Sequence, residues 1–150
     1  MAQSLANVIV HLVFSTKHRV PLIDASVEAD LHAYLAGVAK HLDCQPHKIG
    51  GVEDHVHVAC SLARTIAVAD LVQELKQSSS KWIKIRSDAC GSFAWQNGYG
   101  AFSVSQSHLE ALRRYVATQR EHHRQQTYQE EFRTLLERYR IDYDERYVWD

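Results

Sequence analysis

Two histidines separated by one residue, His55 and His57, are the side chains in this sequence best spaced to bind a metal ion. They lie in the segment 53–62, Glu-Asp-His-Val-His-Val-Ala-Cys-Ser-Leu, whose alternating apolar residues predict a β-strand. Because side chains alternate along a strand, both imidazoles point to one face while Val56 and Val58 point to the other. Residues on the same face stand roughly 6.5–7 Å apart, so both rings can reach one divalent ion.

A tyrosine and a glutamine further along the chain carry groups that would use such an ion. Tyr115 and Gln119 lie in a segment that we predict to be one helix, opened by a Ser107-x-x-Glu110 capping box and continuing to about His123. Four residues correspond to roughly 40° around a helix axis, so the two side chains share a face. The phenol supplies a nucleophile. The carboxamide oxygen supplies a third ligand for a hard cation such as Mg²⁺ or Mn²⁺, with positions left open for a phosphate oxygen.

Each of these roles has a competitor in the sequence. His122 is the alternative third ligand, although a histidine there also complements the negative C-terminal end of a helix. Glu53 and Asp54 precede the histidines and are candidate hydrogen-bond partners for an imidazole. Four other tyrosines are alternative nucleophiles, none with a glutamine four residues later: Tyr128, Tyr139, Tyr143 and Tyr147.

The spacing of apolar residues predicts the elements that would position these side chains. In chain order we expect a strand, a helix, two strands, a helix, a strand and a helix, at residues 7–15, 27–42, 45–52, 53–62, from 65, 101–104 and 107–123. This order is typical of an α+β, ferredoxin-like (RRM-like) fold. We therefore predict an antiparallel sheet with helices on one face, the histidine strand at its centre, and a C-terminal helix that carries the nucleophile.

The C-terminal part of the chain predicts one more helix and a packed tail. A second capping box, Thr127-x-x-Glu130, opens a shorter helix. The residues after 140 are too rich in aromatic side chains for a solvated end, so we expect them to pack on the body. With 150 residues the chain is long enough for one hydrophobic core, which predicts a single domain over residues 1–150.

The overall charge gives no nucleic-acid signature, because the net charge is −1 and the pI is near 6.8. Any contact with phosphates must come from a local basic patch, and the ordinary interpretation of such a patch is a solvated surface. Trp95 and Tyr99 are either core residues or platforms for unpaired bases, whereas Phe102 fits the core better. The candidates for contacting DNA phosphates are Lys17, Arg19, Lys76, Lys81, Lys84 and Arg86.

Cysteine usage and the N-terminal sequence predict a reduced, cytoplasmic protein. Cys44, Cys60 and Cys90 are odd in number and show no Cys-x-x-Cys spacing. The N-terminus lacks a basic leader region, and no apolar run approaches the ~20 residues that span a bilayer. We expect a protein that is neither exported nor embedded in a membrane.

Taken together, these motifs resemble the HUH single-tyrosine transposases of small single-strand insertion sequences. His55-Val56-His57 is similar to the family's histidine pair around a hydrophobic residue, and Tyr115-x-x-x-Gln119 is similar to its nucleophile helix. The segments 11–19, 95–105 and 128–132 also look like that family, so the resemblance covers nearly the whole chain.

The resemblance implies a metal-dependent transposase that cleaves and rejoins single-stranded DNA. Tyr115 would form a 5′-phosphotyrosine and release a 3′-OH, while His55, His57 and Gln119 would hold Mg²⁺ or Mn²⁺. Because a phosphotyrosine conserves the energy of the broken phosphodiester, no ATP is needed, and the chain has no Gly-x-x-x-x-Gly-Lys motif.

The resemblance also implies partners. The expected substrate is single-stranded DNA with hairpin ends. The expected assembly is a homodimer, in which the tyrosine helix can dock on the partner's histidines and share each active site. Two alternatives stay open: a host-adopted relative that acts on chromosomal repeats, and a non-catalytic nucleic-acid-binding module with a structural metal.

Overall fold

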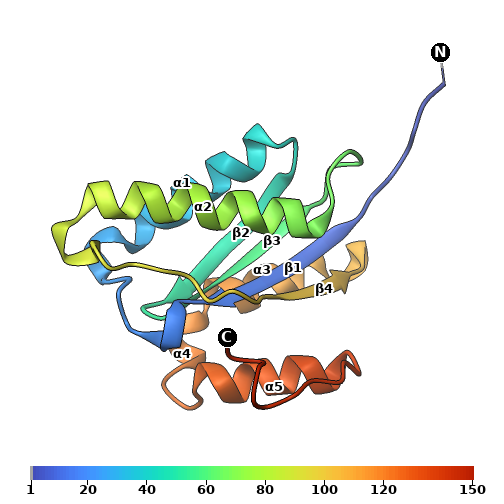
Figure 1. The fold of residues 1–150 in the computed structure, drawn as a ribbon. Helices are drawn as coiled ribbons and strands as arrows, with labels where there is room; N and C mark the ends of the chain where they lie inside the picture. The colour runs from blue at the N-terminus through green and yellow to red at the C-terminus, as the bar shows by residue number, and fades with distance from the viewer. Residues whose placement is uncertain (1) are drawn as a thin grey trace.

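A four-stranded antiparallel sheet forms the centre of the protein in the computed structural model, which describes residues 2–150. Its order is β2-β3-β1-β4, the order of a ferredoxin-like fold (Figure 1). The strands are β1 (Ile9–Ser15), β2 (Gln45–Val52), β3 (His55–Ser61) and β4 (Gly100–Val104). The histidine strand β3 is flanked by β2 and β1, so the predicted fold class and its central position are confirmed.

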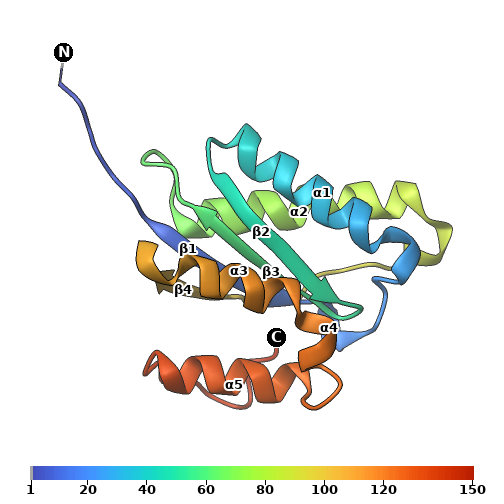
Figure 2. The same ribbon diagram turned by 180° about the vertical axis from the view of Figure 1, so that it is seen from behind.

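Helices cover both faces of the sheet (Figures 1 and 2). On one face lie α1 (Ala25–His41) and α2 (Val68–Arg86), whose apolar sides pack on Val56, Val58 and Cys60. The opposite face carries three C-terminal helices: α3 (Leu109–Ala117), α4 (Gln119–His122) and α5 (Tyr128–Arg138). Because both faces are covered, every residue of β1 is buried. No helix within residues 2–150 is long and apolar enough to cross a membrane.

The predicted helix over 107–123 is wrong in two respects. It is preceded by a short 3-10 helix, Gln106–His108, and Ser107 does not cap it, because the Ser107 hydroxyl bonds the Ser105 hydroxyl at 3.1 Å. It is also interrupted at Thr118, which leaves helical geometry and donates its hydroxyl to the carbonyl oxygen of Arg114 at 2.9 Å. Threonine side chains that bond their own backbone in this way compete with continued helix formation. Tyr115 and Gln119 therefore belong to two helices, α3 and α4.

Other boundaries follow the sequence more closely. The second predicted capping residue is observed, since the Thr127 hydroxyl accepts a hydrogen bond from the backbone amide of Glu130 at 3.2 Å. The helix expected from residue 65 begins three residues later, at Val68. The tail packs back as expected, with Tyr143, Val148 and Trp149 against the α5 side of the sheet.

Two glycines let the C-terminal helices approach the sheet closely. Gly50 lies opposite His57 on β2, and a Cβ atom there would overlap the carbonyl oxygen of Val116 in α3. Gly100 begins β4, and a Cβ atom there would stand 2.6 Å from the ring of Phe132 in α5. The absence of side chains at these positions therefore allows α3 and α5 to contact the sheet beside the histidines.

Candidate active site

Strand β3 places His55 and His57 side by side beneath α3, α4 and α5, with both side chains fully buried. Their ring centroids are 5.1 Å apart. Each Nδ1 atom has a partner: Asp54 Oδ1 lies 2.7 Å from that of His55, and His11 Nε2 lies 2.8 Å from that of His57. Such partners fix ring orientation and tautomer. Both Nε2 atoms therefore face the same interior point between the sheet and α5.

A carboxylate that the sequence did not single out, Glu131 of α5, occupies that point. Its Oε1 atom lies 3.3 Å from Nε2 of His55 and 3.1 Å from Nε2 of His57. The ligand atoms of these three residues all lie within 4.8 Å of one another, and Glu131 is buried. The sequence does contain one indication that Glu131 is buried. Glu131 falls on the apolar side of α5 between Tyr128 and Leu135, where an acidic residue needs a buried partner.

The amide of Gln119 reaches the same point from α4. Its Oε1 atom lies 3.1 Å from Nε2 of His55 and 3.1 Å from Nε2 of His123, which also meets Glu131 Oε1 at 3.1 Å. The competing residue, His122, does not reach the histidine pair: its Nε2 lies 3.1 Å from the Thr118 hydroxyl, and its ring centroid lies 4.8 Å from that of Tyr115. The structure thus brings Gln119 next to the histidine pair, adds His123, and leaves His122 outside the cluster.

Tyr115 completes the cluster, because its hydroxyl donates a hydrogen bond to Glu131 Oε2. Its ring lies 5.7 Å from that of His57 in the same chain. Tyr115 and His57 are therefore adjacent within one chain.

The alternative tyrosines lack this geometry. The ring of Tyr128 is 4.6 Å from that of His55, but its hydroxyl donates to Gln96 Oε1 at 3.3 Å, away from Glu131. The Tyr139 hydroxyl donates to the carbonyl oxygen of Ser103 at 3.0 Å. Neither hydroxyl is directed at the histidine pair.

Burial and mutual contacts set the charges of these groups. Burial lowers the pKa of His57. Burial also acts to lower the pKa of His55, but hydrogen bonds with Asp54 and Glu131 raise it to about 9. Burial acts to raise the pKa of Glu131, yet hydrogen bonds from His123, His55 and His57 hold it well below its usual range. The cluster therefore contains an ionised carboxylate.

The phenol of Tyr115 is held in its protonated form. Burial raises its pKa well above the ordinary tyrosine value, and the neighbouring charge of Glu131 raises it further. A nucleophilic role for this oxygen would therefore require a group that takes its proton.

The converging atoms fit a divalent cation. Two imidazole nitrogens, one carboxylate oxygen and one carboxamide oxygen point at a common position, from His55, His57, Glu131 and Gln119. Oxygen ligands suit Mg²⁺ and Mn²⁺, while the two imidazoles add donors that bind transition metals more strongly than Mg²⁺. Asp54 and His11 would act as the outer partners that orient the two ligating rings.

The predicted basic residues fall into two groups. Lys76, Lys81 and Lys84 line a groove beside α2. Arg86 is instead paired with Asp30, and the Arg19 guanidinium lies 5.6 Å from the ring centre of Trp149. Lys17 is exposed on the short 3-10 helix after β1. Of the two candidate stacking residues, Trp95 is buried in the core, as is Phe102, and Tyr99 is 39% exposed.

A family model described as "Transposase IS200 like" matches residues 4–119. The chain belongs to the IS200-like transposase family. The match includes the histidine pair, Tyr115 and Gln119, and it ends before α5. Glu131 and His123 of this IS200-like transposase are therefore contributed by a segment outside the family match.

Solved structures show the same fold at low identity. A crystal structure of a candidate transposase from Deinococcus radiodurans R1 is 19% identical with a TM-score of 0.61, covering 77% of this chain and 95% of that one. The structure of a REP-associated tyrosine transposase bound to a REP hairpin is 13% identical with a TM-score of 0.52, covering 77% of this chain and 68% of that one. No curated protein matches this IS200-like transposase.

Proposed function

We propose that this IS200-like transposase is a metal-dependent enzyme that cleaves and rejoins single-stranded DNA through a 5′-phosphotyrosine at Tyr115. The observation that carries the proposal is the position of Glu131. One carboxylate oxygen meets both histidine Nε2 atoms, and the other accepts the hydrogen bond of the Tyr115 hydroxyl. Nucleophile and metal-ligating groups thus share one buried contact, which a merely structural metal site would not require.

In this reaction the phenolic oxygen of Tyr115 forms a bond to phosphorus, and the bond from phosphorus to the 3′ oxygen breaks. The phenolic proton leaves along its hydrogen bond to Glu131 Oε2 and passes on to water, because the low pKa of Glu131 prevents the carboxylate from keeping it, and the departing 3′ oxygen takes up a proton from water. A bound Mg²⁺ or Mn²⁺ held by His55, His57, Gln119 and Glu131 would neutralise charge on the scissile phosphate. The reverse step, attack of a 3′-OH on the phosphotyrosine, rejoins the strands.

The catalytic centre proposed here, formed by the two histidines, Gln119 and Glu131 beside Tyr115, is buried, which implies that α5 moves when DNA enters. The side chains of both histidines are fully buried, and those of Gln119 and Glu131 are 1% and 2% exposed. A phosphate cannot reach the common point while α5 covers it. The observed arrangement is therefore a closed state, in which α5 and the tail packed on it must shift to admit the phosphate while Glu131 stays within reach of the ion and of Tyr115.

The proposed substrate is single-stranded DNA with a hairpin, acted on in the cytoplasm. Support comes from the family resemblance and from the similar fold of a transposase bound to a REP hairpin. A homodimer also belongs to the proposal, and β4, one of the two edge strands of the sheet, is the edge that we propose pairs with a second copy. A host-adopted relative acting on chromosomal repeats would use the same chemistry.

The decisive experiment is a search for the covalent intermediate. Labelled single-stranded DNA with a hairpin is incubated with the protein and Mn²⁺ or Mg²⁺, and a denaturing gel separates the protein-linked DNA. Tyr115→Phe should form no detectable adduct while it still binds the DNA, because one oxygen is removed from a ring whose packing survives. Tyr128→Phe is the matched control and should keep the adduct. An adduct formed by Tyr115→Phe but not by Tyr128→Phe would show that the nucleophile is Tyr128.

A non-catalytic module with a structural ion makes the opposite prediction. In that case neither the unmodified protein nor Tyr128→Phe forms an adduct, and removal of the ion with EDTA unfolds the protein. Circular dichroism with and without EDTA measures this directly.

A further inference from the structure

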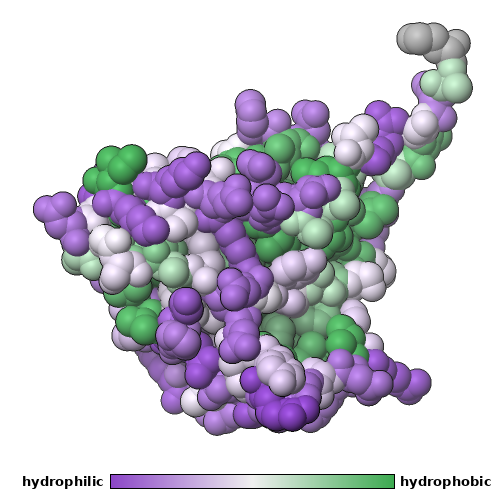
Figure 3. All heavy atoms as spheres, in the orientation of Figure 1, coloured by the Kyte–Doolittle hydropathy of each residue, from purple (hydrophilic) through white to green (hydrophobic). Residues whose placement is uncertain are grey.

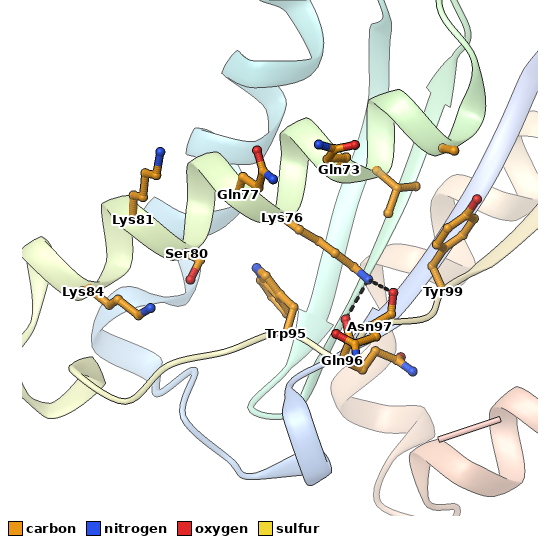
Figure 4. A pocket seen from close by; sticks show the side chains of 12 residues that line it. Gln73, Lys76, Gln77, Ser80, Lys81, Lys84, Trp95, Gln96, Asn97 and Tyr99 are labelled. Carbon is orange, nitrogen blue, oxygen red and sulfur yellow. Dashed lines mark hydrogen bonds between the residues drawn. The ribbon is translucent and has the colours of Figure 1, made fainter. Parts of the chain in front are cut away.

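An open groove runs along α2, which lies on the other side of the sheet from α5 (Figures 1 and 4). One wall is α2 and the other is the segment 95–99, which connects the core to β4. Its volume is about 690 Å³. Hydrophilic side chains gather along the exposed side of α2 (Figure 3). Unlike the catalytic centre, this groove is open to a large ligand without any movement of the chain.

Lys76 holds the two walls together. Its Nζ atom donates to the carbonyl oxygens of Gln96, Asn97 and Gly98 at 2.8, 3.2 and 2.6 Å. Burial lowers the pKa of Lys76 to about 8, so the amine is still charged at neutral pH. All three of its donors are used within the protein. Lys76 therefore shapes the groove and is not free to bind a phosphate, contrary to the role expected from the sequence.

The remaining lining offers groups that suit an unpaired nucleic-acid strand. Gln73, Gln77 and Lys84 repeat at helical spacing along α2, and Lys81 stands at the rim. Tyr99 is 39% exposed, and its ring is held 5.7 Å from the Lys76 amine. No acidic side chain lines the groove in the part of the chain that the structure describes. Cationic side chains beside an exposed aromatic ring are the combination that binds a phosphate backbone and stacks a base.

The groove is connected to the catalytic centre through one residue, Gln96. Gln96 lines the groove, and its Oε1 atom accepts hydrogen bonds from the Ser15 amide at 2.8 Å and the Tyr128 hydroxyl at 3.3 Å. The ring of Tyr128 in turn lies 4.6 Å from that of His55. A strand bound in the groove would therefore lie two side chains away from the histidine pair.

We propose that this groove binds an unpaired segment of the single-stranded DNA substrate, with Tyr99 stacking on a base and Lys81 and Lys84 contacting phosphates. The inference rests on the proposed function for its choice of DNA. It assigns the groove a recognition role that is separate from the chemistry at Tyr115. Net charge does not supply the attraction, since the whole chain carries −1. The attraction must therefore depend on these local residues.

Binding is measured without catalysis, by fluorescence anisotropy of a labelled unstructured oligonucleotide in EDTA. Lys81→Gln/Lys84→Gln should weaken binding roughly tenfold at low salt, and should reduce the slope of log affinity against log salt by about 1.4, at ~0.7 per phosphate contact. The matched control is Lys40→Gln/Lys48→Gln, which removes two exposed lysines away from the groove. Equal weakening by both pairs would overturn the proposal, because it would indicate a general charge effect.

Tyr99 tests the stacking contact. Tyr99→Ala should weaken binding on the order of tenfold, and Tyr99→Phe should restore it, because stacking needs the ring and not the hydroxyl. Tyr147→Ala, at another exposed tyrosine, should have no effect. Unchanged binding by Tyr99→Ala, or equal losses for the oligonucleotide and for a blunt hairpin, would refute a single-strand site.

The outcomes separate this inference from the proposed function. If the unmodified protein forms the adduct and the groove variants bind DNA normally, the proposed chemistry stands and the groove proposal is refuted. If the groove variants lose DNA binding and the unmodified protein forms no adduct, the groove stands as a DNA-binding site and the proposed chemistry is refuted.

Discussion

The catalytic centre and the α2 groove lie two side chains apart, yet their physical properties are opposite. The centre is fully buried, and its polar atoms bond one another through Glu131, His55 and His57. The groove is open, positively charged and lined by exposed glutamines and lysines. Gln96 and Tyr128 lie between them.

The difference teaches how one small domain can separate chemistry from recognition. Buried groups in fixed positions stabilise charge strongly because water is excluded, but they cannot select a substrate from solution. Exposed cations and an aromatic ring attract a strand and respond to salt, but they cannot activate a phenol. Changes in the centre should therefore alter cleavage without altering binding, and changes in the groove should do the reverse.

The sharpest test of this separation removes the metal ligands. His57→Ala should abolish cleavage while hairpin binding persists, because the ion acts at the scissile phosphate and the hairpin is held elsewhere. His55→Ala and EDTA should have the same effect. Cleavage and electrophoretic mobility shifts measure the two properties in parallel. Full-rate cleavage in EDTA would contradict a metal-dependent mechanism.

A smaller but informative loss should come from Glu131→Gln, which keeps the shape of the side chain and removes its charge. The amide can still accept the Tyr115 hydrogen bond but cannot take the proton, so adduct formation should slow on the order of 10²-fold. Glu130→Gln, on the exposed side of the same helix, is the matched control. Equal rates for the two variants would exclude Glu131 from the reaction.

Metal binding should release a proton, because contacts with Asp54 and Glu131 outweigh burial and raise the pKa of His55 to about 9 in the metal-free protein. Only neutral imidazole ligates a metal, so binding below pH 9 must expel that proton. The affinity for Mn²⁺ should therefore rise by up to about tenfold per pH unit toward pH 9 and then level. Calorimetry in buffers of different ionisation enthalpy counts the released proton. A pH-independent affinity between pH 7 and 9 would contradict this assignment.

No recovery of activity is expected when two inactive variants are mixed. Tyr115 contacts Glu131 and lies beside His57 of its own chain, so a dimer of Tyr115→Phe with His57→Ala would contain a defect in each centre. Cleavage by verified mixed dimers measures this outcome. Partial recovery would show that subunits exchange their tyrosine helices in solution, as the family resemblance implied.

The sheet and the histidine pair could be predicted from the sequence because their signals are local. Alternating Val56 and Val58 specify the side of β3 that packs on α1 and α2, and so direct His55 and His57 to the opposite side. The single-helix prediction for Tyr115 and Gln119 failed at Thr118, whose hydroxyl bonds the preceding turn. The two side chains still meet, since α4 turns Gln119 inward.

The rest of the centre depends on tertiary packing that no short motif records. His11 reaches His57 through the pairing of β1 with β3, whereas His123 and Glu131 reach the histidine pair only because the C-terminal segment folds back over the sheet. The acidic residue on the apolar side of α5 was the one local signal available. Lys76 shows the opposite error, because a surface lysine in a basic stretch proved to be held by backbone carbonyls.

The two glycines under the C-terminal helices imply that Tyr115 and Glu131 are aligned by backbone spacing. Gly50 admits Val116, the neighbour of Tyr115, and Gly100 admits Phe132, the neighbour of Glu131. A methyl group at residue 50 would meet a main-chain carbonyl that has no freedom to rotate away, whereas one at residue 100 would meet a ring that can turn. The distance of Tyr115 from the sheet is thus the least adjustable dimension of the proposed active site. A related sequence with a larger residue at position 50 would need a different position of α3 to keep this active-site geometry.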